Sequence, residues 1–307
     1  MQILRKKLIH LHRCRGVTRH TIRRMLKLES SLSSLYQLSS SQLSHHYAIP
    51  YKNAQLLYSD LHNQQIHASL KRDINQFTIV TIVDEMYPNV LKTIKDPPFV
   101  LYALGDLSLL SHKPALSVIG TRNPSQQAYR KMAFILRPMM EKNFLVVSGM
   151  ANGIDSYAHQ LALNHKGKTI AVLGSGFHHI YPKRNIALFH KLAQHGLLLS
   201  EYIPDALPER FHFPERNRII SGLSFGTLVI EAKERSGTLI TVDQALDQGR
   251  EVYAVPDSPL LPETVGCHRM IQDGAKLVFH AADIIEDWEA MKHIFIESEH
   301  KHMDNVR

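Results

Sequence analysis

The chain has 307 residues, of which 44% are hydrophobic and 21% are charged, and its formal net charge is +8. This composition is typical of a globular protein and excludes a disordered one. No apolar run approaches the roughly 20 residues that a membrane-spanning helix needs, and the first residues lack the cleavage site of a secretory signal. Two cysteines are too few for a disulfide framework. We therefore expect a reduced, cytoplasmic protein with no membrane partner.

The positive charge is concentrated in the first quarter of the chain. Residues 1–75 contain twelve Lys and Arg against three Asp and Glu, a net charge of +9, whereas the rest contains 24 against 25. Such asymmetry is typical of a nucleic-acid-binding module beside a neutral domain. A solvated helical surface would give the same count, and composition alone does not decide between the two.

Residues 1–73 are predicted to form a small, basic, all-helical domain. Thr18 is a suitable N-cap residue, and Pro50 suits the first turn of a helix. The segment 15–26, RGVTRHTIRRML, is similar to a helix–hairpin–helix turn but lacks its second glycine, so it indicates DNA binding only weakly. The expected helices cover residues 2–12, 18–28, 31–37, 41–47 and 50–72.

From residue 77 onward, short apolar segments alternate with helical ones. Strands that are apolar throughout and alternate with helices indicate a parallel sheet that is buried on both faces. We therefore predict an α/β fold, an extended Rossmann-like, doubly wound and mostly parallel sheet over residues 74–290, followed by a polar tail over 291–307. The expected strands cover residues 77–83, 98–105, 115–120, 144–149, 169–174, 197–201, 227–232 and 251–256.

The loops after these strands are rich in glycine and in cations. In doubly wound sheets the ligand lies beyond the carboxyl ends of the strands. Glycines there allow a close approach of the backbone, and helix N-termini offer unpaired amides to an anion. The sequence therefore predicts an anion-binding rim with room for several phosphates, whose cations are Arg122, Lys183, Arg216 and Arg218.

Several more specific motifs are incomplete or occur in the wrong structural context. A Walker-A-like string at 162–169 follows a helix and precedes a strand, the reverse of a P-loop. GSGFHH at 174–179 lacks the third glycine of a dinucleotide fingerprint. The histidines lack zinc-protease spacing, and neither Ser148 nor Ser175 lies in G-x-S-x-G. We therefore expect no cofactor, no metal and no catalytic constellation.

Seven ordered motifs together resemble the DprA/Smf family of bacterial DNA-processing proteins. They are VIGTR, SGMANGID, AVLGSG with YPKRN, SEY, FPERNRIISGLS, VIEA, and SGTLITVDQAL with GREVYAVP, spread over about residues 77–288. The resemblance implies a recombination mediator without a catalytic step. Such a protein binds single-stranded DNA, protects incoming DNA and loads the RecA recombinase during natural transformation. The implied partners are single-stranded DNA, RecA, a second copy of the chain and single-strand-binding protein.

The resemblance also implies roles for particular positions. The role of the RNR motif stays open, because one of its arginines could instead pair with Glu201 or Glu231 to fix the loop. Candidate dimer-interface residues are His268, Ile271 and Leu277, and candidate recombinase contacts are Leu246 and Gln272. The residues implied to contact single-stranded DNA are Gly120, Thr121, Arg122, Ser148, Gly149, Lys183, Asn185, Arg216, Asn217 and Arg218.

An enzyme is the alternative. SGLSFGTLVIEA at 221–232 is similar to the loop of phosphoribohydrolases that cleave nucleoside monophosphates, with Glu231 and Arg218 in the catalytic roles. Against this, its first pair of glycines is incomplete, and the loops carry more cations than one phosphate requires. The chain also departs from the DprA/Smf pattern: Asp257 stands where the family usually has glycine, and no winged-helix domain is expected after Trp288. The basic N-terminal helices resemble the SAM-like domain of some members.

Overall fold

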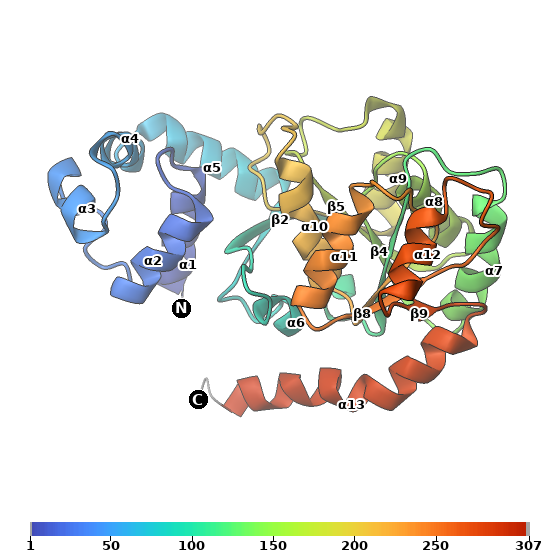
Figure 1. Ribbon diagram of the computed structural model, residues 1–307. Helices are drawn as coiled ribbons and strands as arrows, with labels where there is room; N and C mark the ends of the chain where they lie inside the picture. The colour runs from blue at the N-terminus through green and yellow to red at the C-terminus, as the bar shows by residue number, and fades with distance from the viewer. Residues whose placement is uncertain (1, 305–307) are drawn as a thin grey trace. The chain divides into compact units, whose positions relative to one another are not determined.

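In the computed structural model, which describes residues 2–304, the chain forms two compact units (Figure 1). The first comprises residues 1–87 and 98–103, and the second comprises 88–97 and 104–307. The boundary predicted after residue 73 falls inside helix α5 (Gln64–Gln76). No helix of the described residues is long and apolar enough to cross a bilayer.

The first unit is helical with one antiparallel pair of strands. Its helices are α1 (Gln2–Arg13), α2 (Arg19–Leu28), α3 (Ser40–His46), α4 (Tyr51–Leu61) and α5, and strand β1 (Thr78–Thr81) pairs antiparallel with β2 (Val100–Gly105). Thr18 caps α2 as predicted, since its side chain accepts from the Thr21 amide.

Two helix predictions in this unit are wrong. Residues 31–37 form turns, because Leu32 takes a positive φ of 49° that a right-handed helix excludes. The helix predicted over 50–72 is two helices, since Asn63 caps the start of α5 by accepting from the Gln65 amide.

The second unit is built on parallel strands. Its described strands follow the order β6-β5-β4-β3-β7-β8-β9, and each paired neighbour is parallel. β3, β4, β6 and β7 are buried along their whole length, as expected for a sheet covered on both faces. This confirms the predicted mostly parallel, doubly wound α/β fold. The strands are β3 (Ala115–Ile119), β4 (Leu145–Ser148), β5 (Lys168–Leu173), β6 (Leu197–Ser200), β7 (Gly226–Val229), β8 (Glu251–Ala254) and β9 (Lys276–Leu277).

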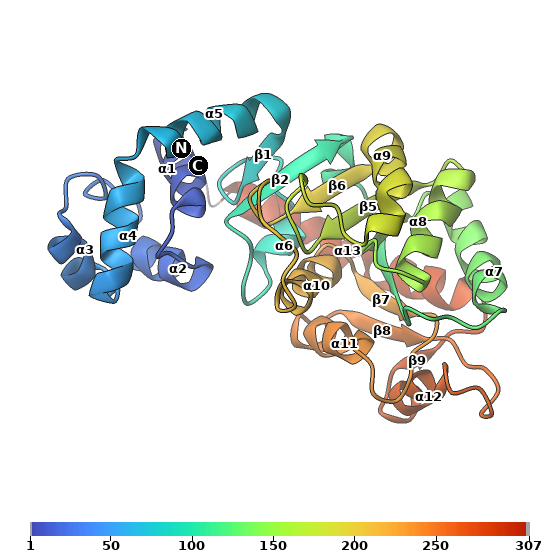
Figure 2. The same cartoon turned by 90° about the horizontal axis from the view of Figure 1, so that it is seen from above.

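Helices cover both faces of this sheet (Figure 2). One face carries α7 (Ala128–Glu141), α8 (Ile154–Asn164) and α9 (Ile186–His195), and the other carries α10 (His212–Gly222), α11 (Thr238–Asp247) and α12 (Val265–Gln272). The short α6 spans Asn89–Lys92, and two 3₁₀ turns span Leu107–Ser111 and Lys183–Asn185.

The C-terminal segment is helical. Helix α13 runs over Ala282–Asp304, so the polar tail predicted from residue 291 continues a helix as far as Asp304, and 305–307 lie outside the described residues. Trp288 anchors α13 to the sheet, with its ring centroid 5.1 Å from that of Phe225.

The direction of winding reverses between β3 and β7. From β3 the chain adds β4, β5 and β6 on one side, and from β7 it adds β8 and β9 on the other. At such a switch point the loops leaving the two strands diverge, which opens a crevice at the carboxyl edge of the sheet.

Candidate nucleic-acid interface

A cavity of about 670 Å³ lies at this switch point. The loops after β3, β4 and β5 supply one side of its lining, and α10, with the segment that leads into α11, supplies the other. Its lining residues fall in the ranges 119–123, 151–155, 181, 210–220 and 233–241.

The charge of the lining is strongly positive. Asp155 is the single carboxylate among the described lining residues, against five cations. Because of this excess, the lining would repel a cationic ligand and would leave its own positive charge unbalanced around a neutral one. Phosphates would be attracted. The five cations are Arg122, Arg210, Arg216, Lys233 and Arg235.

Arg216 lies at the floor of the cavity and is 4% exposed. Its Nη1 donates to the Gly149 carbonyl at 2.6 Å and to the Val172 carbonyl, and its Nε donates to Asn217 Oδ1 at 3.1 Å. Burial lowers the pKa of Arg216 to about 10, so the guanidinium stays charged at neutral pH. It therefore contributes a fixed positive charge whose position is set by backbone carbonyls.

Gly149 is a glycine because of Arg216. A Cβ built on it would lie 2.2 Å from Arg216 Nη1, closer than any side chain permits. The Gly149 amide donates to Asp155 at 3.2 Å. Burial raises the pKa of Asp155, although the Arg216 charge acts in the opposite direction. Gly149 thus makes room for the floor of the cavity.

Aromatic rings and a cation meet at the cavity's edge. The exposed Arg122 lies over the Phe213 ring, with its guanidinium carbon 6.0 Å from the ring centroid. The Tyr181 ring lies 5.5 Å from that of Phe213, and Tyr181 is 46% exposed. Gly174 allows this packing, since a Cβ there would meet Phe213 at 2.8 Å.

The other predicted contact residues divide into two groups. Gly120 and Thr121 line the cavity with Arg122 and Asn217. Three others lie outside its lining. Ser148 is fully buried and its hydroxyl donates to the Val118 carbonyl at 2.6 Å. Asn185 is buried and donates to the Met150 carbonyl at 2.9 Å, and Lys183 is exposed.

Arg218 lies away from the cavity, although only Asn217 separates it from Arg216 in the chain. Its Nη2 donates to both carboxylate oxygens of Glu201, at 2.7 and 2.8 Å, and both side chains are buried. The alternative in which one arginine of the RNR motif pairs with Glu201 to fix the local structure therefore holds for Arg218.

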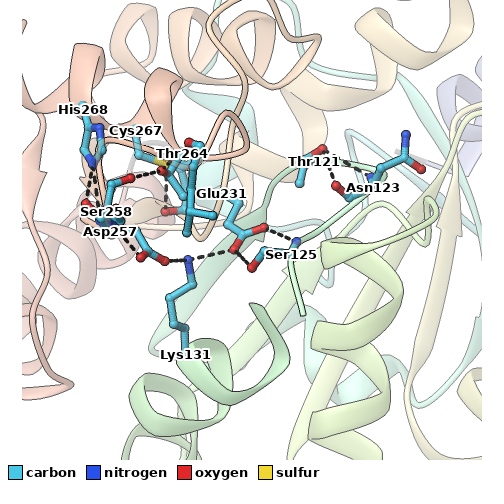
Figure 3. Close-up of polar contacts among 12 residues, drawn as sticks. Thr121, Asn123, Ser125, Lys131, Glu231, Asp257, Ser258, Thr264, Cys267 and His268 are labelled. Carbon is cyan, nitrogen blue, oxygen red and sulfur yellow. Dashed lines mark hydrogen bonds and ion pairs between the residues drawn. The ribbon is translucent and has the colours of Figure 1, made fainter. Parts of the chain in front are cut away.

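Glu231 has different partners (Figure 3). Its carboxylate, fully buried, accepts from the Ser125 amide and hydroxyl and pairs with Lys131 at 2.8 Å. Arg218 and Glu231 are thus held in separate ion pairs, which leaves the phosphoribohydrolase alternative without the residue pair it needs. Among the described residues no group of three or more His, Cys, Asp or Glu could hold a metal ion.

Asp257, which stands in place of the expected glycine, joins the same network. Lys131 lies between Glu231 and Asp257, and pairs with Asp257 at 2.5 Å (Figure 3). Burial alone would lower the pKa of Lys131, but the two carboxylates raise it. The His268 imidazole lies 3.0 Å from the Asp257 carbonyl oxygen. The network therefore links α7, the ends of β7 and β8, and α12.

Sequence reasoning missed the cationic and aromatic lining residues Tyr181, Arg210, Phe213, Lys233 and Arg235. Tyr181 and Phe213 begin the YPKRN and FPERNRIISGLS motifs, and Arg210 lies three residues before the second of these. Lys233 and Arg235 lie within three residues after VIEA. Their proximity to motifs already identified was the available signal.

The candidate interface residues lie on α11, α12 and β9. Leu246 is 59% exposed and Leu277 is 45% exposed, while Gln272 is exposed and Ile271 and His268 are half-buried. Phe279, beyond β9, is 72% exposed. Apolar side chains therefore gather at the open edge of the sheet.

Comparison with known proteins identifies the family. The family model of DNA recombination-mediator protein A matches residues 78–289. The chain belongs to this family. The DNA processing protein DprA of Bacillus subtilis is 43% identical over 236 residues, which cover 72% of this chain and 80% of that protein. DprA of Streptococcus pneumoniae is 43% identical over 222 residues, 72% of this chain and 78% of that one.

Solved structures of the same family agree in fold. The X-ray structure of DprA from S. pneumoniae matches with a TM-score of 0.79 and 36% identity, over 92% of this chain and 96% of that one. The DprA of Helicobacter pylori, whose structure is described as showing a single-stranded DNA binding mode, matches with a TM-score of 0.63 and 27% identity, over 70% of this chain and 96% of that one. These relatives confirm the resemblance that the seven motifs indicated.

Proposed function

We propose that the cavity at the switch point binds the backbone of single-stranded DNA, and that the protein acts in the cytoplasm as a recombination mediator rather than as an enzyme. The observation that carries the proposal is the lining itself, five cations against one carboxylate. A single phosphate needs fewer charges, whereas successive phosphates of one strand would use them all.

The aromatic edge favours a single strand over a duplex. Proteins that bind single strands combine a cationic groove with aromatic rings on which unpaired bases stack, and each stacked base contributes about 1–3 kcal/mol. Tyr181 and Phe213 offer such rings beside Arg122. In a duplex the bases are paired and stacked on one another, so no unpaired base would be available to stack on these rings. The H. pylori relative described as binding single-stranded DNA supports the same choice.

A salt titration tests the proposal. Wild-type protein should bind a labelled oligo-dT strand with an affinity that falls steeply with salt, because bound phosphates release counterions. Arg122→Ala should weaken binding to all sequences alike and make the logarithmic salt dependence shallower by about 0.7, the value for one phosphate contact on a single strand. Lys142→Gln, an exposed change at the end of α7, is the matched control. Equal affinities of Arg122→Ala and the control would contradict the assignment.

Loading of the RecA recombinase and self-association complete the proposed role. The exposed apolar edge around β9 supports a two-fold contact through His268, Ile271 and Leu277, with Leu246 and Gln272 offered to the recombinase. Because these surfaces adjoin, recombinase binding would compete with dimerisation and thereby couple loading to dissociation of the dimer.

A filament assay tests this part. On strands coated with single-strand-binding protein, wild-type protein should shorten the lag before RecA filaments form. Gln272→Ala should reduce that effect while oligo-dT affinity stays unchanged, since Gln272 lies outside the cavity. A wild-type protein that binds DNA and leaves the lag unaltered would refute the loading role and leave the DNA-binding proposal intact.

A further inference from the structure

The first unit holds its buried carboxylates in internal ion pairs. Asp73 is 3% exposed and pairs with Arg13 at 2.5 Å, and Asp60 is fully buried and pairs with Arg15 at 2.7 Å. The Arg15 guanidinium donates to both carboxylate oxygens of Asp60, and the Arg15 backbone amide donates to one of them. Neither carboxylate is therefore available to neutralise a further cation at the surface.

Glu29, the remaining acid of residues 1–75, is also engaged. It accepts hydrogen bonds from the hydroxyls of Ser33, Ser34 and Tyr47. Although burial acts to raise the pKa of Glu29, these bonds lower it to about 2. All three acids of this segment are thus engaged, and none is left for the exposed lysines and arginines other than Arg15.

Helix α2 concentrates exposed positive charge. Arg24 and Lys27 are exposed and three residues apart, so they project from the same face of the helix. The opposite face buries Ile22 and Met25, which are 3% and 0% exposed. The helix, RHTIRRMLKL, contains no acid and no Phe, Tyr or Trp, and its single ring is the exposed imidazole of His20. Its outer surface therefore presents cations on a rigid helix, without the Phe, Tyr or Trp rings on which unpaired bases commonly stack.

We propose that the outer face of α2 binds the phosphate backbone of duplex DNA, as a second DNA site on the first unit, distinct from the cavity of the second unit. Charge complementarity supports a polyanion, since no carboxylate of the segment opposes these cations. The lack of Phe, Tyr and Trp on α2 favours a duplex, whose bases are already stacked and which offers its backbone for contact. Such contacts carry no sequence information, so binding is independent of sequence.

Binding of the full chain to a blunt-ended duplex of about three helical turns tests this site. Arg24→Gln/Lys27→Gln should weaken binding at low salt, and the logarithmic salt dependence should become shallower by about 1.8, at about 0.9 per phosphate contact. The matched control is Arg137→Gln/Lys142→Gln, which removes the same charge from exposed positions at the end of α7. The duplex affinity of this control should stay closer to that of wild type than the duplex affinity of the α2 variant does.

The outcomes separate this proposal from the proposed function. Arg122→Ala should lose oligo-dT affinity and keep duplex affinity, while the α2 variant should show the reverse. Duplex binding by the α2 variant equal to that of the control, or no duplex binding by the wild type, would overturn the second site and leave the cavity assignment unaffected. A duplex affinity lost in Arg122→Ala to the same extent as in the α2 variant would also overturn it.

Discussion

Arg216 and Arg218 stand two positions apart and use their charges differently. Arg216 donates to backbone carbonyls at the floor of the cavity and not to a carboxylate, so its positive charge is kept. Arg218 forms an ion pair with Glu201, which neutralises its charge. Since both are buried, the difference lies in their partners and not in their exposure. One arginine therefore contributes to the potential of the cavity, and the other to stability.

Arg218 gives a stability prediction. Replacing Arg218 by Met leaves the Glu201 carboxylate buried without its cation, which should lower the free energy of unfolding by about 3–5 kcal/mol. Arg210→Met removes an exposed cation of the cavity and should change it by less than about 0.5 kcal/mol. Urea unfolding followed by Trp288 fluorescence measures both. Equal stability of the two variants would show that the Glu201 pair does not hold α10 in place.

At the scale of elements, the strands of the second unit were predictable and α10 was not. Strands such as β3 and β4 are apolar except for one serine each and are followed by glycine, so the sequence marks them clearly. Helix α10 buries Arg216 and Arg218 among its inward positions, and this breaks the apolar periodicity from which a helix is predicted. The two-residue β9 carries no periodic signal at all.

The same limit applied to the cavity. The glycine-rich loops and Arg122 stand directly after strands in the sequence, so the sequence predicted them as part of the site. The pairing of Tyr181 with Phe213 was not found, because it joins residues that are far apart in the chain and meet only through the packing of Phe213 on Gly174. No local pattern encodes such a contact.

The open edge at β9 gives a prediction about assembly. An edge strand presents unpaired backbone groups, and the exposed Leu277 and Phe279 lie beside it. In a two-fold contact one substitution is introduced twice, so Leu277→Glu should place two like charges together and yield folded monomers. Phe134→Glu, on the exposed side of α7, should leave the dimer intact. Light scattering that finds Leu277→Glu still dimeric would place the interface elsewhere.

Across the whole molecule, positive charge occurs in two distinct settings. In the second unit, cations surround a cavity with aromatic rings at its edge, at the one place where the winding of the sheet reverses among the described strands. In the first unit, cations lie on the outer face of a helix whose neighbouring acids are used internally. The net charge of +8 alone would not distinguish these settings, since the partners of each charge decide its availability.

The central claim is that a single strand lies in the cavity at the switch point. Photo-crosslinking with an oligo-dT strand that carries iodouracil tests it most directly, because the halogenated base crosslinks to an aromatic ring on which it stacks. Mass spectrometry of the digested complex should place the crosslink on Phe213 or Tyr181, and Arg122→Ala should reduce its yield. Efficient crosslinks confined to residues outside the cavity, with none at Phe213 or Tyr181, would contradict the account.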